Sequence, residues 1–205
     1  NPQNNQLVYQ NKTSLRGLSD AFFSSKQELF IIANRMGMVY YFPSYKAEFI
    51  ALKNALTSNI LGLVEWNKEV VGINNNQLIV FNGKNFVKKR EFENDLTSIG
   101  VIDQKLWLGS IGSLIRIEGD ETQKIQLDEH LAIKSLIPSI NRNHLWMGTN
   151  WGVYYFNLEN QETIFKISAE DGLSGNEVIQ NGLYLDQKGL LWISTYHGLS
   201  NFNIK

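Results

Sequence analysis

The sequence predicts an all-β fold, a β-propeller of four-stranded antiparallel blades. Three observations carry this prediction: one β-hairpin recurs about every 40 residues, β-prone runs flank each copy, and helical periodicity is nearly absent. Repeat proteins of similar period that stack as solenoids use helices, so the missing helical pattern favours blades. The best helical candidate, residues 45–56, is equally consistent with a strand and a loop.

The hairpin is clearest at residues 145–156. Residues 145–148 form an apolar strand, Asn150-Trp151-Gly152 form the turn, and residues 153–156 form the return strand. Gly152 can take the positive φ that such turns require. In the five copies a small residue closes the first strand: Ala33, Gly72, Gly109, Gly148 and Ser194.

Each hairpin is extended to four strands by its neighbours. The β-prone runs that precede the hairpins are residues 18–23, 60–66, 96–102, 133–140 and 178–185. The outer runs that follow are residues 47–50, 86–89, 123–127 and 163–167. The predicted blades therefore span residues 14–50, 55–90, 94–127, 131–167 and 172–205 of a single domain.

The fifth unit ends after its third strand, while a lone β-prone run, residues 6–10, precedes the first unit. We expect this run to complete the last blade, since that would close a five-blade ring and remove an exposed sheet edge. The alternative is that the five blades are a segment of a larger propeller.

Both faces of the middle strands should be buried between blades. Trp107, Trp146 and Trp192 occupy one equivalent position and are expected to act as core wedges. Gly109 and Gly148 are expected where facing sheets approach closely. The run 186–189 is a predicted turn between two strands of the last unit.

Composition excludes several classes of function. The net charge is −1, which gives no electrostatic case for nucleic acid or an anionic membrane. The chain has no cysteine, and no run is long and apolar enough for a transmembrane helix. Asp171 and Asp186 each lack a second oxygen ligand at loop spacing, so we expect no metal site, and we expect no cofactor.

Residues 170–178, EDGLSGNEV, and 186–202, DQKGLLWISTYHGLSNF, resemble the two-component regulator propeller repeat. The fourth unit keeps LWMGTNWGVYYF and the third keeps LWLGS, whereas the first two match in pattern alone. The resemblance implies the periplasmic sensor region of a hybrid histidine kinase from Bacteroidetes. Such receptors sense breakdown products of glycans and signal as dimers, so it implies an oligosaccharide ligand and a homodimer. The chain itself carries no kinase motif.

The default binding surface of a propeller is the axial face, where the turns between second and third strands gather. An aromatic ring beside amide and imidazole groups suits sugar recognition, and a guanidinium suits a carboxylate or sulfate. Packing of Trp151 on a neighbouring blade is the alternative. The predicted ligand-binding residues are Arg35, Asn74, Asn150, Trp151, Tyr196 and His197.

Two other functions stay open. A propeller lyase or hydrolase could use His197 with Glu170 or Asp171, and streptogramin lyases have related repeats. We predict no catalytic residue, because none of the three histidines lies in a recognised catalytic spacing. The last possibility is a scaffold for protein–protein interaction.

Overall fold

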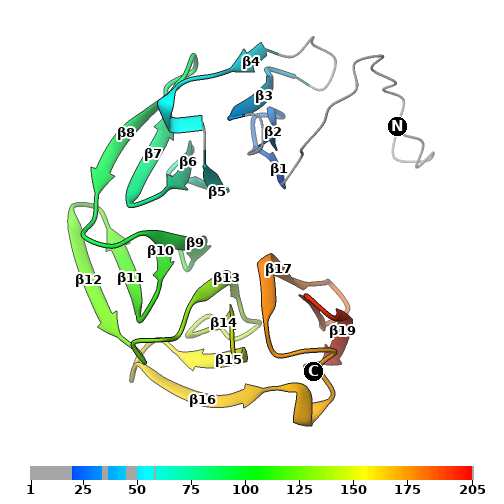
Figure 1. Cartoon of the computed structure of the whole chain (residues 1–205). Helices are drawn as coiled ribbons and strands as arrows, with labels where there is room; N and C mark the ends of the chain where they lie inside the picture. Colours follow the sequence, from blue (N-terminus) through cyan, green and yellow to red (C-terminus); the bar gives the residue numbers. More distant parts are fainter. Residues whose placement is uncertain (1–19, 34–36, 45–49, 58, 205) are drawn as a thin grey trace.

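The chain folds into five antiparallel sheets that stand around a common centre, which makes it a five-blade β-propeller (Figure 1). The structure, a computed structural model, describes residues 20–33, 37–44, 50–57 and 59–204. Within each sheet the strand order follows the chain order, so every blade is a simple meander. The fold class that the repeats predict is confirmed.

Most strands agree closely with the predicted runs. The predicted outer run 47–50 is the exception, since it overlaps an observed strand only at Ile50 and residues 47–49 lie outside the described residues. The first blade contains β1 (Asp20–Phe23), β2 (Leu29–Ala33), β3 (Met38–Phe42) and β4 (Ile50–Leu52). The second contains β5 (Ile60–Trp66), β6 (Glu69–Asn74), β7 (Gln77–Phe81) and β8 (Phe86–Glu91). The third contains β9 (Leu96–Ile102), β10 (Lys105–Ser110), β11 (Ser113–Glu118) and β12 (Glu121–Gln126). The fourth contains β13 (Ile133–Pro138), β14 (His144–Thr149), β15 (Gly152–Asn157) and β16 (Glu162–Ile167), and the fifth contains β17 (Val178–Leu185), β18 (Leu190–Thr195) and β19 (Gly198–Asn203).

The ends of the repeat are less complete. The fifth sheet has three strands among the described residues, and the predicted closing run 6–10 lies outside them. Of the possible helix at 45–56, the described part forms the strand β4 and the short 3₁₀ helix η2 (Ala55–Thr57). The local β-rich context therefore outweighs the weak helical pattern.

Apolar side chains hold neighbouring blades together. Each of the four junctions from the first blade to the fifth contains one buried apolar cluster. At the junction of the second and third blades, for example, Ile73 of β6 and Leu108 of β10 belong to the same cluster. Trp107 and Trp146 are each 2% exposed, which confirms their role as core wedges, whereas Trp192 is half-buried. The close approach at Gly109 is also confirmed, because an added Cβ would lie 2.8 Å from Cβ of Ile133 in the next blade.

The junction between the fifth and first blades differs from the other four. The described residues form no apolar cluster across it. Instead, Asn181 Nδ2 of β17 donates a hydrogen bond of 2.7 Å to Asp20 Oδ2 of β1. Tyr184 and Leu199 of the fifth blade are 64% and 61% exposed. Polar contact at the axis therefore joins the two ends of the described ring.

The propeller has two distinct faces. The turns between second and third strands, such as Asn150-Trp151 and Tyr196-His197, lie on what we call the upper face. The turns between first and second strands, such as residues 139–143, lie at the opposite strand ends, on the lower face. Because antiparallel strands alternate in direction, every blade presents the same kind of turn to the same face.

Candidate functional site

Exposed apolar side chains mark the upper face on three successive blades. Ile111, Trp151 and Tyr196 occupy the turns that follow β10, β14 and β18, and they are 58%, 38% and 65% exposed. Turn residues are usually small or polar, so a large apolar side chain at each turn needs a reason. Such rings and branched chains offer flat apolar contact to a ligand that lies across several blades.

The turn of Trp151 is held rigidly by its neighbours. Thr149 Oγ1 accepts a hydrogen bond of 3.0 Å from the backbone N–H of Trp151 and donates one of 2.8 Å to the carbonyl of Gly152. Gly152 has φ 115°, and an added Cβ would lie 2.3 Å from the carbonyl oxygen of Ile167. Only glycine fits there, so the prediction that Gly152 shapes this turn is confirmed.

The asparagines predicted to bind ligand are engaged within the fold. Asn150 Nδ2 donates to the carbonyl of His130 (3.0 Å), and its Oδ1 accepts from the N–H of Ala132 (2.9 Å). Asn74, the last residue of β6, is buried, and its Nδ2 donates to the carbonyl of Leu56 (2.8 Å). Both amides brace a turn against the incoming loop. Their role toward a ligand stays a prediction.

Tyr196 belongs to a small charged cluster. Lys134 Nζ of β13 lies 5.2 Å from the ring centroid of Tyr196 and 2.5 Å from Glu177 Oε1. The backbone N–H of Tyr196 donates to the carbonyl of Glu177 (3.1 Å). The cation–π contact places the ammonium of Lys134 over the ring of Tyr196, which is still 65% exposed. No hydrogen bond or ring contact joins Trp151 to Tyr196 or His197, although all three are described.

His197, the next residue after Tyr196, forms no hydrogen bond or ion pair with an acidic side chain among the described residues. It is exposed, and its imidazole packs so closely on Gly175 that a Cβ there would lie 2.7 Å from Nδ1. Asp171 is used elsewhere, since its Oδ2 accepts from the N–H and hydroxyl of Ser168 (2.8 and 3.0 Å) and caps η3 (Ala169–Asp171). Neither Asp171 nor Glu170 forms a hydrogen bond or ion pair with His197.

Three further facts complete the description of the candidate site and of the described chain. Arg35 lies outside the described residues. Within the described part of the chain, no group of three histidine, aspartate or glutamate side chains could hold a metal ion. In the same part, no helix has the length and apolar character needed to cross a membrane.

Sequence reasoning missed a polar group at the axis. Asn181 has φ 53° within a register shift of β17, and besides Asp20 its Nδ2 reaches the carbonyl of Leu61 (3.0 Å). Gln180 Nε2 donates to the carbonyl of Thr97 (2.7 Å). Burial raises the pKa of Asp20, opposed by hydrogen bonds from Ala21 and Asn181. The Asn-Gly pair that interrupts the apolar run 178–185 is the one signal that could have revealed this bulge.

Comparison with known families bears on the last repeat. Residues 172–197, which run from the loop before β17 to the Tyr196-His197 turn, match the model of the two component regulator propeller. The chain carries a two component regulator propeller repeat. The repeat contains β18, the strand of Trp192, and two of the predicted ligand-binding residues. No curated protein sequence matches the chain.

Solved structures with the same fold include extracellular domains of signalling systems named as one component or two component. The extracellular domain of a putative one component system from B. thetaiotaomicron matches with a TM-score of 0.77 and 17% identity, over 95% of this chain and 28% of that chain. The extracellular domain of a putative hybrid two component system from the same organism gives a TM-score of 0.76 and 13% identity, over 92% of this chain and 28% of that chain. Virginiamycin B lyase from Staphylococcus aureus gives 0.69 and 13%, over 96% and 73%. The chain thus spans under a third of the two extracellular domains.

Proposed function

We propose that this propeller is a ligand-binding segment of an extracytoplasmic two-component receptor, and that it recognises an oligosaccharide or a related ligand on its upper face. The observation that carries the proposal is the row formed by Ile111, Trp151 and Tyr196 on three successive blades. The two component regulator propeller repeat in the last blade and the fold shared with sensor extracellular domains support the receptor assignment.

The chemistry of the row suits a sugar chain. Pyranose rings present flat faces of C–H groups that pack on Trp and Tyr rings, while their hydroxyls need hydrogen-bond partners at the rim. Exposed His197 can donate or accept such bonds, and the Lys134–Glu177 pair supplies both a donor and an acceptor beside Tyr196. A ligand of several rings would contact several blades at once.

The location and the assembly of the receptor follow from the same proposal. The sensor domains that share the fold are extracellular, so we infer a periplasmic position for this propeller. We also infer that the full receptor works as a homodimer, as two-component receptors do. Ligand binding would then change the contacts between the two propellers of the dimer and would not start a chemical reaction within one propeller.

Calorimetric titration with neutral oligosaccharides of increasing length tests the proposal. Affinity should rise with length, and Trp151→Ala or Tyr196→Ala should lower it by roughly tenfold, since one aromatic contact contributes about 1 kcal/mol or more. Tyr184→Ala is the matched control, because Tyr184 is 64% exposed but lies away from the upper-face turns. Absence of binding by every oligosaccharide would contradict the proposal.

A lyase is the second candidate, favoured by the fold shared with virginiamycin B lyase over 73% of that enzyme. The candidate needs a titratable partner for His197, and neither Asp171 nor Glu170 contacts it. Turnover of a streptogramin-type substrate that His197→Ala abolishes would replace the receptor assignment with this one. Retention of oligosaccharide binding by His197→Ala, without any turnover, would support the receptor.

A further inference from the structure

The strands that line the axis share one irregularity near the upper face. Figure 1 shows β5, β9, β13 and β17 innermost in their blades. In β5, β9 and β13 the pairing with the second strand slips by one residue, and the extra residues are Leu61, Thr97 and Lys134. A β-bulge leaves its extra residue outside the ladder. The backbone groups of such a residue therefore need partners elsewhere in the fold.

The fifth blade carries a longer bulge at the same place. The pairing of β17 with β18 jumps from Val178 to Leu183, so residues 179–182 stand opposite Ser194 alone. We call residues 179–182 the axial bulge. Asn181 within it takes φ 53°, a conformation in which asparagine is enriched among residues other than glycine. The axial bulge is long enough to reach the first, second and third blades.

The axial bulge supplies partners for the short bulges. Gln180 Nε2 donates a hydrogen bond of 2.7 Å to the carbonyl of Thr97, and Asn181 Nδ2 donates one of 3.0 Å to the carbonyl of Leu61. The same Nδ2 donates to Asp20 Oδ2 of the first blade (2.7 Å). Carbonyl groups that the ladders leave free are thus satisfied across the axis. The axial bulge is therefore hydrogen-bonded to three blades besides its own.

The start of the axial bulge is fixed by the short bulge of the fourth blade. Lys134 Nζ lies 2.5 Å from Oε1 of Glu177, the residue before β17, and 5.2 Å from the ring centroid of Tyr196. The carbonyl of Glu177 accepts a hydrogen bond from the N–H of Tyr196 (3.1 Å). The Lys134 side chain is 18% exposed, so this ion pair is partly shielded from solvent. The chain thus enters the axial bulge from a fixed point on the upper face.

The far end of the axial bulge meets the junction that lacks an apolar cluster. Buried apolar clusters hold the other four junctions together, whereas the described residues form none between the fifth and first blades. A shift of the axial bulge by about 1 Å would take the hydrogen bond between Asn181 and Asp20 out of bonding range. No apolar cluster of the described residues would compensate for that loss. The first blade is therefore the part of the ring most sensitive to the position of the axial bulge.

We propose that the axial bulge couples the cluster of Lys134, Glu177 and Tyr196 on the upper face to the junction between the fifth and first blades. The cluster sets where the axial bulge begins, and the axial bulge sets whether Asn181 meets Asp20. Lys134 is a positioning residue in this scheme, since it forms no hydrogen bond or ion pair with the described part of the first blade. The coupling stands without oligosaccharide binding; a ligand held by Tyr196 would act on the junction through it.

Amide hydrogen exchange of the full chain, followed by mass spectrometry, tests the proposal. Lys134→Met removes the cation and should accelerate exchange in β1 and β2 about two- to fivefold, the effect of losing one partly exposed ion pair. Lys134→Arg keeps the positive charge and should leave exchange in β1 and β2 unchanged. Lys166→Met is the matched control, because Lys166 Nζ lies 5.6 Å from the ring centroid of Tyr154 in the same blade but forms no hydrogen bond or ion pair with the axial bulge.

A double variant separates the coupling from a general loss of stability. Asn181→Gly already removes the hydrogen bond to Asp20, so adding Lys134→Met to it should cause no further acceleration in β1 and β2. Exchange in β11, whose blade has an apolar cluster on each side, should stay unchanged in Lys134→Met. Three results would each overturn the proposal: additive acceleration in the double variant, equal acceleration in β11, or no effect of Lys134→Met on β1 and β2.

Discussion

Single side chains decide which turns the blades use. Asp186 is the clearest case: its Oδ1 accepts from the N–H groups of Lys188 (2.8 Å) and Leu190 (2.9 Å), and its Oδ2 accepts from Nε1 of Trp192 (3.1 Å). One carboxylate therefore closes the turn between β17 and β18 and fixes the half-buried indole of Trp192. The predicted turn at 186–189 is confirmed, with Gly189 at φ 81°.

These hydrogen bonds make the turn sensitive to pH. The bond from Leu190 and then that from Trp192 lower the pKa of Asp186 below its ordinary value of 3.8. Its carboxylate therefore stabilises the fold at neutral pH, and this contribution is lost as the pH falls through the lowered pKa. Asp186→Asn should lower the urea midpoint at neutral pH, with a smaller difference at about pH 3. Asp120→Asn, whose carboxylate has no hydrogen bond within the described residues, should change neither midpoint.

Contacts between strands of neighbouring blades set the spacing of the blades. Gly148 of β14 faces β17, and an added Cβ would lie 2.8 Å from Cγ1 of Val178 and 3.1 Å from Cγ of Leu183. Its backbone does not need a positive φ, so the constraint is space alone. The sequence predicted this close approach from the repeated small residue at the end of each second strand.

Gly148→Ala should therefore push the fourth and fifth blades apart and lower the free energy of unfolding by about 1–3 kcal/mol. Urea denaturation measures this change. Combining Gly148→Ala with Val178→Ala should recover part of the loss, because the second substitution removes the atom that the new methyl group meets. Ser194→Ala, at the equivalent position of the fifth blade, adds no atom and is the control. If the double variant were the sum of the two single ones, the steric explanation would be wrong.

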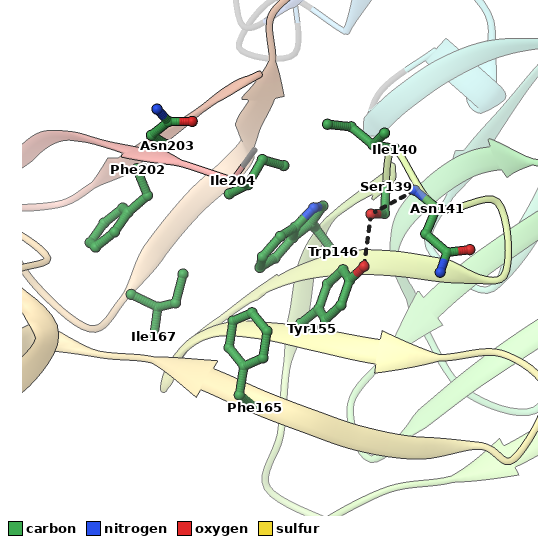
Figure 2. Close-up of a pocket in the computed structure, with 10 residues that line it drawn as sticks. All are labelled: Ser139, Ile140, Asn141, Trp146, Tyr155, Phe165, Ile167, Phe202, Asn203 and Ile204. Carbon is green, nitrogen blue, oxygen red and sulfur yellow. Dashed lines mark hydrogen bonds between the residues drawn. The ribbon is translucent and has the colours of Figure 1, made fainter. Parts of the chain in front are cut away.

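At the scale of the whole molecule, repetition explains what could be predicted. The strands β5, β9 and β17 have the bounds that the sequence predicted, since a buried position recurs at a fixed offset in each unit. A cleft between the fourth and fifth blades (Figure 2) could not be predicted, because the residues that line it, such as Phe165 and Phe202, come from different blades. The internal use of the Asn74 and Asn150 amides was equally hidden, because each partner is a backbone carbonyl or N–H in a separate loop.

The axis is where distant parts of the chain meet. Asn181 joins the fifth blade to Asp20 of the first and to Leu61 of the second, and the described residues add no apolar cluster between the fifth and first blades. Asn181→Gly keeps the positive φ of 53° and removes the amide. Amide hydrogen exchange in β1 and β2 should then accelerate by roughly tenfold, the effect of losing one or two hydrogen bonds.

The same experiment distinguishes a local from a global effect. Exchange in β10 and β14, whose blades are joined by apolar clusters on both sides, should not change in Asn181→Gly. Asn67→Gly is the control, because Asn67 has nearly the same φ of 52° in a turn, where its side chain forms no hydrogen bond with the described residues. Uniform acceleration in all five blades would mean that the axial hydrogen bonds stabilise the ring as one cooperative unit. Acceleration confined to the first and fifth blades would mean that Asn181 stabilises only their junction.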